Sequence, residues 1–182
     1  MSFEEPTLIE RSLEPLGYHL LHFHHRNFVD RLGLVGDERV LDFGCGGGAS
    51  ARHIVKRLTD GHLTCLDISE FWLDRARRRV GDDRVDYHLG RVDDLDSSFD
   101  AVLIHYVIHD IPDGEREGTV SSLVERMDVG ARLLVQEPTK EGHGMPPEEL
   151  DGLMGSAGLR KTESSRRRST YTAVYHKVDT AP

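Results

Sequence analysis

Short apolar runs alternate with amphipathic stretches from Arg39 to the end of the chain. The runs of strand length are RVLDFG, HLTCLDI, RVDYHLG, FDAVLIHYV and ARLLVQEP. The other stretches have apolar residues at helical spacing, and they read ASARHIVKRL, EFWLDRARRRV, EREGTVSSLVERM and PEELDGLMGSAGL. This alternation predicts an α/β fold in which a parallel sheet carries helices on both faces.

The segment LRKTESSRRRSTYTAVYHK near the end departs from this alternation. It predicts two successive strands joined by a polar turn, with Arg166, Arg167 and Arg168 in the turn. Strands joined by a tight turn run antiparallel. We therefore expect an antiparallel pair to close the sheet.

The N-terminal segment predicts an arm followed by a helix. Residues 1–17 are polar and contain turn-forming prolines and a glycine, which favours a loose arm. A stripe of apolar spacing then begins at Tyr18 and ends near Gly33. The members of this stripe are Leu20, Leu21, His24, Phe28 and Leu32. Because the sequence has no internal repeat, we expect a single domain over residues 18–182.

Composition limits the partners of the chain. Hydrophobic residues make up 37% and charged residues 30%, with a formal net charge of −9, which disfavours nucleic acid or an anionic membrane as a partner. No apolar run reaches membrane-spanning length and no secretory leader opens the chain, so we expect a cytoplasmic protein. Two cysteines, Cys45 and Cys65, are too few for a disulfide framework.

The stretch VLDFGCGGGAS carries the most specific chemistry. Gly44 and Gly46 follow the first apolar run, where glycine allows a sharp turn and lets a ligand approach the backbone. Asp67 ends the second run about 20 residues later, where a carboxylate can accept both hydroxyls of a ribose. The sequence therefore predicts a nucleoside ligand at the carboxyl ends of these strands.

The residues leave two nucleosides open. Gly44 to Ala49 satisfies the GxGxxA form of the dinucleotide fingerprint, which would make the chain an NAD-linked oxidoreductase. Asp42 stands two residues before Gly44. Its negative charge there would repel a pyrophosphate but suits the ammonium and sulfonium groups of S-adenosylmethionine. A tight turn without any ligand, with Asp67 as a simple acid at a helix start, is the structural alternative.

Three stretches together resemble the class I S-adenosylmethionine-dependent methyltransferases. VLDFGCGGGAS is similar to their motif I, LTCLDIS to their ribose-binding strand end, and FDAVLIHYVIHDIP to the stretch around their fourth strand. The resemblance spans residues 28–177 and is closest to the small single-domain UbiE/type 11 kind. It implies a Rossmann-like seven-stranded fold with sheet order 3-2-1-4-5-7-6, an antiparallel strand 7, and S-adenosylmethionine as the cofactor.

The resemblance also assigns residues to the cofactor. They are Asp42, Gly44, Cys45, Gly46, Asp67, Ile68, Val92, Asp93 and His105. In the family the first of these flank the methionine moiety, the acid after the second strand holds the ribose, and its successor contacts adenine. Val92 and Asp93 are placed at the adenine edge and His105 at the methionine end. The family often has Gly-Asp after the third strand where this chain has Gly90-Arg91, which leaves adenine recognition to Asp93, its neighbour or the backbone.

Histidines supply the candidate catalytic bases. His105 and His109 follow the fourth strand and His143 follows the fifth, at the edge where this fold binds ligands. A neutral imidazole there can take a proton from an acceptor hydroxyl or ammonium group. Ordinary packing and helix capping are the alternative. His19, His22, His24 and His25 suggest a metal site, and His22 and His25 share a helical face. No cysteine or nearby acid completes a ligand set, so no metal is expected.

These features predict methyl transfer from S-adenosylmethionine to a small-molecule acceptor that the sequence does not identify. No Asn-Pro-Pro-Tyr or Asp-Pro-Pro-Tyr motif, typical of amino-methylation of DNA bases or protein glutamine, follows the fourth strand. The acidic charge favours a small acceptor over RNA. The alternatives are a catalytically silent cofactor-binding or scaffold protein of the same fold, and an NAD-linked oxidoreductase.

Overall fold

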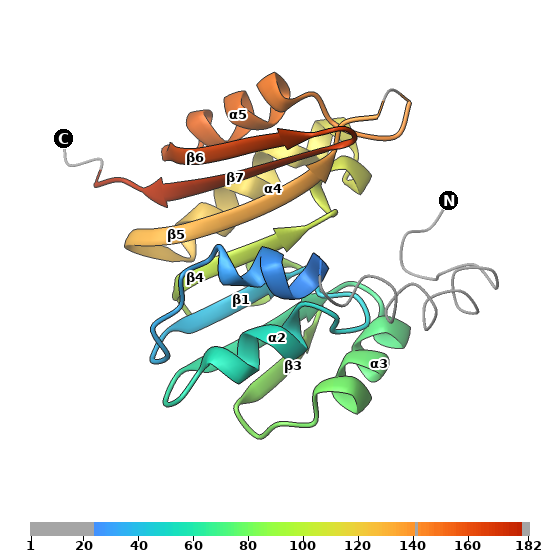
Figure 1. Ribbon diagram of the computed structural model, residues 1–182, viewed down its shortest axis with the longest axis vertical. Helices are drawn as coiled ribbons and strands as arrows, with labels where there is room; N and C mark the ends of the chain where they lie inside the picture. Colours follow the sequence, from blue (N-terminus) through green and yellow to red (C-terminus); the bar gives the residue numbers. More distant parts are fainter. Residues whose placement is uncertain (1–23, 141, 180–182) are drawn as a thin grey trace. The chain divides into compact units, whose positions relative to one another are not determined.

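The computed structural model describes residues 24–140 and 142–179 (Figure 1). Within these residues, seven strands form one mixed sheet in the order β3-β2-β1-β4-β5-β7-β6. The strands are β1 (Arg39–Phe43), β2 (His62–Asp67), β3 (Val85–Leu89), β4 (Phe99–His105), β5 (Met127–Pro138), β6 (Leu159–Arg167) and β7 (Thr170–Lys177). The α-helices after β1 are α2 (Ala51–Ile54), α3 (Glu70–Val80), α4 (Asp113–Glu125) and α5 (Pro147–Ser156). Short 3-10 helices are η1 (Val55–Arg57), η2 (Val92–Asp94) and η3 (Ile108–Asp110).

Strand pairing confirms the predicted topology. The pairs β1–β2, β2–β3 and β4–β5 are parallel, whereas β7 runs antiparallel to both β5 and β6. The α/β class, the sheet order and the antiparallel seventh strand are therefore confirmed.

Two strand boundaries differ from the predicted ones. β5 begins at Met127, four residues before the predicted start, because its pairing with β4 shifts register across a bulge that includes Gly130, whose φ is 84°. Arg166 and Arg167 belong to β6, and the turn begins only at Arg168. Every residue of β6 after Leu159 is exposed, so no apolar alternation marks where this edge strand ends.

The helix predicted as ASARHIVKRL is shorter than expected. The α-helical part is limited to α2, and the chain then tightens into η1, a common way for a helix to end. Ahead of β1, residues 24–30 are helical, and Phe28, Val29 and Leu32 are buried, which agrees with the predicted apolar stripe. The first part of that predicted helix lies outside the described residues.

The chain divides between Arg91 and Val92 into two compact units. The first contains β1 to β3 with α2 and α3, and the second contains β4 to β7 with α4 and α5. One domain over residues 18–182 stays a prediction, and the predicted arm over residues 1–17 lies outside the described part. Among the helices that the structure describes, none has the length and apolar character needed to cross a membrane.

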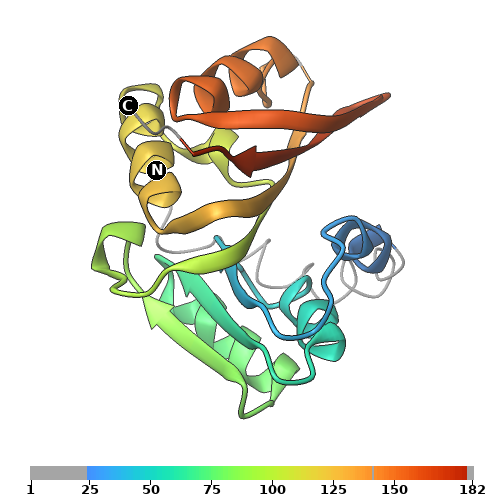
Figure 2. The same ribbon diagram turned by 90° about the vertical axis from the view of Figure 1, so that its left-hand side faces the viewer.

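In the second unit, α5 lies along the β6–β7 hairpin (Figures 1 and 2). The hydroxyls of Tyr171 and Tyr175 donate hydrogen bonds to Asp151 of α5 at 2.9 and 2.5 Å, and Lys161 of β6 forms an ion pair with the same carboxylate at 2.5 Å. Burial opposes the charge of Asp151, but these three donors outweigh it and lower its pKa. The network fixes which face of the hairpin lies against α5.

Candidate functional site

The glycine-rich loop after β1 has two separate needs for glycine. At Gly48, whose φ is 76°, an added Cβ would lie 2.9 Å from the Cα of Ala76, so only glycine lets the loop pack against α3. At Gly46, whose φ is 50°, an added Cβ would meet no heavy atom within 4 Å. The backbone of Gly46 therefore turns in a conformation that favours glycine and leaves open space beside it.

Asp67, at the end of β2, joins this loop to the start of α3. Its Oδ2 accepts a hydrogen bond from the Gly46 N–H at 2.8 Å, and its Oδ1 accepts one from the Ser69 N–H at 2.9 Å. Burial raises the pKa of Asp67, although these backbone donors oppose the rise. The Ile68 N–H is a third backbone donor to this carboxylate. A carboxylate has about four lone-pair sites, so Asp67 can still accept a hydroxyl. A simple helix-start role would explain the Ser69 bond but not the Gly46 bond.

Asp42 is a buried carboxylate in the same unit. Its side chain accepts a hydrogen bond from the Ala51 N–H, but its Oδ2 is buried without a hydrogen-bond partner among the described residues. Burial, and secondarily the charge of Asp67, raise the pKa of Asp42 from 3.8 to about 7. A buried acceptor of this kind is rare in folded proteins, which makes it a candidate ligand contact.

Two exposed apolar side chains flank Asp67. Ile68 is 45% exposed, and Leu89, which pairs with Asp67 across the β2–β3 ladder, is 49% exposed. Exposed apolar side chains beside a carboxylate offer a surface that suits a flat nucleobase. Ile68 was predicted for this role, whereas Leu89 was not, although it ends the third apolar run.

The Cys45 side chain faces away from the loop surface. It is buried, and its thiol interacts with the thiol of Cys65. That interaction and burial raise the pKa of Cys45 well above its ordinary value. Any contribution of Cys45 to a ligand site therefore has to come from its backbone.

The first arginine triplet is partly structural. The Arg79 guanidinium donates to the carbonyl of Gly47 and so holds the glycine loop, and Arg77 pairs with Asp74 at 2.9 Å. Of the three consecutive arginines Arg77, Arg78 and Arg79 of α3, Arg79 is therefore part of the packing and not of a solvated helix face. The loop draws part of its support from α3.

In the second unit, Val92 and Asp93 lie in η2. Val92 is buried and the Asp93 side chain is exposed, while the Asp93 carbonyl accepts a hydrogen bond from Arg126 at 3.2 Å. Their role at an adenine edge stays a prediction.

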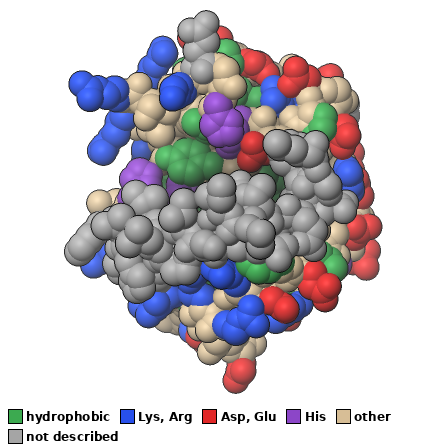
Figure 3. All heavy atoms as spheres, turned by 90° about the vertical axis from the view of Figure 1, so that its right-hand side faces the viewer, with side chains coloured by type: hydrophobic (Ala, Val, Ile, Leu, Met, Phe, Trp, Pro, Cys, Tyr) green, Lys and Arg blue, Asp and Glu red, His purple; other side chains and the backbone are tan. Residues whose placement is uncertain are grey.

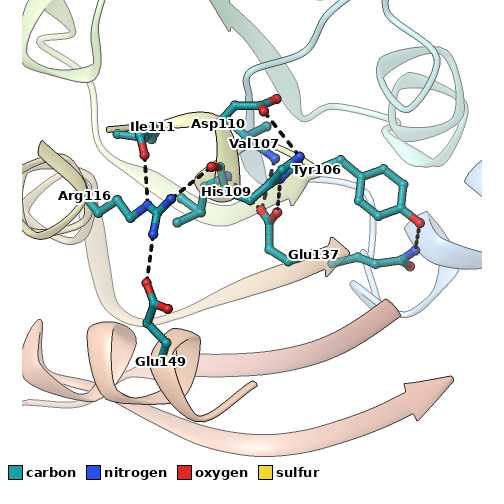
Figure 4. Close-up of polar contacts among 10 residues, drawn as sticks. Tyr106, Val107, His109, Asp110, Ile111, Arg116, Glu137 and Glu149 are labelled. Carbon is teal, nitrogen blue, oxygen red and sulfur yellow. Dashed lines mark hydrogen bonds and ion pairs between the residues drawn. The ribbon is translucent and has the colours of Figure 1, made fainter. Parts of the chain in front are cut away.

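Glu137, the penultimate residue of β5, is fully buried and collects three donors (Figure 4). Its Oε1 accepts the N–H groups of Val107 at 3.0 Å and Ile108 at 2.8 Å, and its Oε2 lies 2.6 Å from Nδ1 of His109. Because a carboxylate only accepts, the hydrogen bond places the His109 proton on Nδ1 and leaves Nε2 as the basic nitrogen of the neutral ring. The sequence shows that Glu137 lies at the end of an apolar strand, but it does not show which groups donate hydrogen bonds to it.

His109 sits in a charged setting, with its side chain 8% exposed. Burial and the charge of Arg116 favour the neutral ring and so lower the pKa of His109. The hydrogen bond and charge of Glu137, together with the charge of Asp110, act in the opposite direction and outweigh them. The pKa of His109 is therefore raised. Arg116 donates to the carbonyl of His109 at 3.0 Å and pairs with Glu149 of α5 at 2.8 Å (Figure 4).

The structure brings two of the three predicted histidines together. The ring of His143, in the exposed loop after β5, meets the ring of His109 edge-on, with centroids 5.3 Å apart. His105 stacks on Tyr106 at 4.3 Å. Tyr106 has a φ of 61°, the one positive φ outside glycine in the described chain, and its hydroxyl accepts a hydrogen bond from Gln136. Such strain is typical of functional sites, and the sequence gives no sign of it.

Residues 24–140 and 142–179 contain no group of three or more His, Cys, Asp and Glu side chains that could hold a metal ion. Of the two histidines on the shared helical face, His22 lies outside those residues. The Nδ1 atom of His25 lies 3.5 Å from the hydroxyl oxygen of Ser50.

The sheet order with its antiparallel seventh strand, the glycine loop after β1 and the acid at the end of β2 define the class I S-adenosylmethionine-dependent methyltransferase fold. The chain belongs to the methyltransferase domain family, whose model matches residues 40–130. The cofactor of this class is S-adenosylmethionine, so the predictions of the family and of the cofactor are confirmed.

The chain is also similar to individual proteins of known name. The chain is 39% identical over 59 residues to the sterol 24-C-methyltransferase erg-4 of Neurospora crassa, an alignment that covers 32% of this chain and 15% of that protein. It is 23% identical to the carboxy-S-adenosyl-L-methionine synthase of Alteromonas mediterranea over 93% of this chain and 73% of that protein. The N-methyltransferase NodS from Bradyrhizobium japonicum, crystallised with S-adenosylhomocysteine, has the same fold, with a TM-score of 0.73 and 16% identity over 85% of this chain and 86% of that one.

The residues of the first unit fit this cofactor. The unpartnered Oδ2 of Asp42 suits a cationic ammonium group, whereas a pyrophosphate would meet a buried carboxylate. Asp67 retains acceptor capacity for a ribose hydroxyl, and Ile68 and Leu89 offer apolar surface.

Asp67→Ala is expected to weaken the binding of S-adenosylhomocysteine by about 1–3 kcal/mol, because charge-assisted hydrogen bonds to the ribose are lost. Calorimetric titration measures the change. Asp86→Ala is the matched control, since the Asp86 carboxylate is exposed on β3 and pairs with His62. An unchanged dissociation constant in a folded Asp67→Ala protein would remove Asp67 from the site.

Proposed function

We propose that this protein transfers the methyl group of S-adenosylmethionine to an oxygen or nitrogen atom of a small-molecule acceptor, with His109 as the general base. The observation that carries the proposal is the buried 2.6 Å contact between Nδ1 of His109 and the carboxylate of Glu137. A histidine oriented by a buried carboxylate is a recurrent arrangement for taking up a proton.

The pair favours acceptors that need a base. S-adenosylmethionine supplies an already activated methyl group, so the protein has to hold the nucleophile in line and remove its proton. A hydroxyl or an ammonium needs that removal, whereas a carboxylate or thiolate hardly does. Glu137 keeps Nε2 of His109 free of a proton and its charge stabilises the imidazolium that forms when His109 takes one.

Other residues take supporting roles in this proposal. Asp42 binds the ammonium of the cofactor and Asp67 its ribose, with Gly44 and Gly46 giving backbone access and Ile68 and Leu89 contacting adenine. The remaining residues assigned to the cofactor are Cys45 through its backbone, Val92, Asp93 and His105. His143, exposed in its loop and edge-on to His109, borders the acceptor side.

The small size of the acceptor is inferred from charge. A chain with a formal net charge of −9 is poorly suited to nucleic acid. We place the protein in the cytoplasm, acting on a dissolved metabolite rather than on a membrane.

Turnover of a compound panel tests the proposal. The purified chain is incubated with S-adenosylmethionine and hydroxyl, amine, carboxylate and thiol compounds, and release of S-adenosylhomocysteine is followed. Methylation of a hydroxyl or amine compound is expected. Methylation of thiols or carboxylates alone would contradict a role for a base. Binding of S-adenosylhomocysteine without turnover of any compound would favour the silent binding protein.

A further inference from the structure

The second arginine triplet is a patch of positive charge that the fold does not use. Arg166, Arg167 and Arg168 are all exposed, and within the described residues none of their side chains forms an ion pair or a hydrogen bond. The first triplet differs, because Arg77 pairs with Asp74 and Arg79 holds the glycine loop. Arg166 and Arg167 end the edge strand β6 and project from its opposite faces, and Arg168 begins the turn. Positive charge is therefore concentrated at the tip of this hairpin, in a chain whose formal net charge is −9.

Strand register places this triplet at the same end of the second unit as the His109–Glu137 pair. β6 runs parallel to β5 because both are antiparallel to β7, so the carboxyl ends of β5 and β6 lie at one edge. Arg166 pairs with Tyr171, and Tyr171 pairs with Glu137. Directly opposed residues of antiparallel strands project from the same face, so Arg166 and Glu137 share a face of the sheet.

The spacing between the two groups is set by the sheet. Two strand intervals separate Arg166 from Glu137, which corresponds to about 10 Å. The loop that carries His143 is tied to the hairpin turn, since the Thr139 N–H donates to the carbonyl of Ser169 at 2.9 Å. Figure 3 shows Lys and Arg side chains gathered at the upper left of that view, where the tip of the β6–β7 hairpin lies. The arginines, the His143 loop and the His109–Glu137 pair are therefore neighbours along one edge.

We propose that Arg166, supported by the positive charge of Arg167 and Arg168 at the same hairpin tip, binds an anionic group, a carboxylate or a phosphate, of the methyl acceptor. This inference rests on the proposed function, because His109 marks the position of the accepting atom. Guanidinium groups bind carboxylates and phosphates through two parallel hydrogen bonds, which gives orientation as well as affinity. The acceptor is accordingly a small organic anion whose charged group is separate from the hydroxyl or amine that is methylated.

The test uses the full-length chain with inorganic phosphate and acetate as separate probes. Nuclear magnetic resonance follows the arginine side-chain Nε–H signals. Both probes are expected to shift the signals of Arg166 to Arg168 in a saturable way, and the stronger probe identifies the preferred anion. Calorimetric titration with the preferred anion compares wild type and variants, and in Arg166→Gln/Arg167→Gln/Arg168→Gln the dissociation constant is expected to rise at least about tenfold.

A matched variant makes the test specific to this patch. Lys56→Gln/Arg78→Gln/Arg160→Gln removes three exposed cations elsewhere, so both variants have the same net charge. The control variant is expected to bind the anion within about twofold of wild type, and both variants to bind S-adenosylhomocysteine unchanged.

Two kinds of result would overturn the proposal. The first is that the arginine signals show no saturable shift, or that both variants lose the same amount of anion affinity. Either outcome would make the patch an ordinary solvated surface. The other is tighter binding of a single-stranded oligonucleotide with a steep dependence on salt, which would assign the patch to nucleic acid. If instead His109→Gln left turnover unchanged while phosphate still bound the arginines, the proposed base would fail and the anion site would stand.

Discussion

Asp42→Asn is expected to make the cofactor-free protein more stable at pH 8 while it weakens cofactor binding. In the wild-type protein the buried Asp42 carboxyl has its pKa raised from 3.8 to about 7, chiefly by burial. At a pH between the ordinary and the raised pKa, the folded state keeps a proton on Asp42 that the unfolded state has released. The free energy of unfolding therefore falls as the pH rises through this range. The charged carboxylate then costs the folded state about 4 kcal/mol at pH 8.

Asparagine keeps an oxygen for the Ala51 N–H but carries no charge. The advantage of the variant in free energy of unfolding is therefore expected to grow by about 2–3 kcal/mol between pH 5 and pH 8. Urea unfolding at the two pH values measures it, with Asp86→Asn as a control of equal charge change on an exposed carboxylate. A pH-independent difference would contradict a buried, ionising Asp42.

The same substitution tests binding. An ammonium that pairs with Asp42 loses its counter-charge in the variant, so the affinity for S-adenosylhomocysteine at pH 8 is expected to fall at least about tenfold. Stabilisation together with loss of binding would show that Asp42 is retained for the ligand and not for the fold. A variant that binds as tightly as wild type would place the ammonium elsewhere.

His109→Gln is expected to lower kcat by about 10²–10⁴, the range that general base catalysis supplies. Glu137→Gln should have a similar effect for a different reason. Its amide would donate to Nδ1 of His109, which moves the ring proton to Nε2 and removes the base. Both variants should bind S-adenosylhomocysteine as wild type does, because neither residue is assigned to the cofactor.

The pH profile separates a base from a structural histidine. Glu137 and Asp110 raise the pKa of His109 against burial and the charge of Arg116, so activity should rise with pH with a midpoint above 6.5, the ordinary value of histidine. His62→Gln is the matched control, because His62 also pairs with a carboxylate, at 2.9 Å, but is exposed. If His109→Gln and Glu137→Gln kept the wild-type rate and profile, catalysis would rest on positioning alone.

Much of the fold could be predicted because β1, β4 and the second part of β5 are largely buried on both faces and therefore stand out as apolar runs. The prediction failed at β6 and at the start of β5, where this signal is missing. β6 is exposed along nearly its whole length, so Arg166 and Arg167 were assigned to a turn. The start of β5 was missed because Gly130 looks like a strand breaker, whereas it forms part of a bulge.

The candidate site was predictable where it lies within one local stretch. Asp42 and Asp67 stand at fixed positions around the glycine loop, so their types and spacing were informative. The role of Glu137 depends on donors that lie about 30 residues earlier in the chain, from Val107 to His109, which no local pattern reveals. The Cys45 thiol turns towards Cys65 because of strand pairing, and this too is invisible in the sequence.

Calorimetric titration of the wild-type protein with S-adenosylhomocysteine and with NAD tests the central claim most directly. The account predicts saturable one-to-one binding of S-adenosylhomocysteine that tightens about tenfold from pH 6 to pH 8, as the Asp42 carboxyl with its pKa of about 7 ionises, and no binding of NAD. Binding of NAD without any binding of S-adenosylhomocysteine would contradict it.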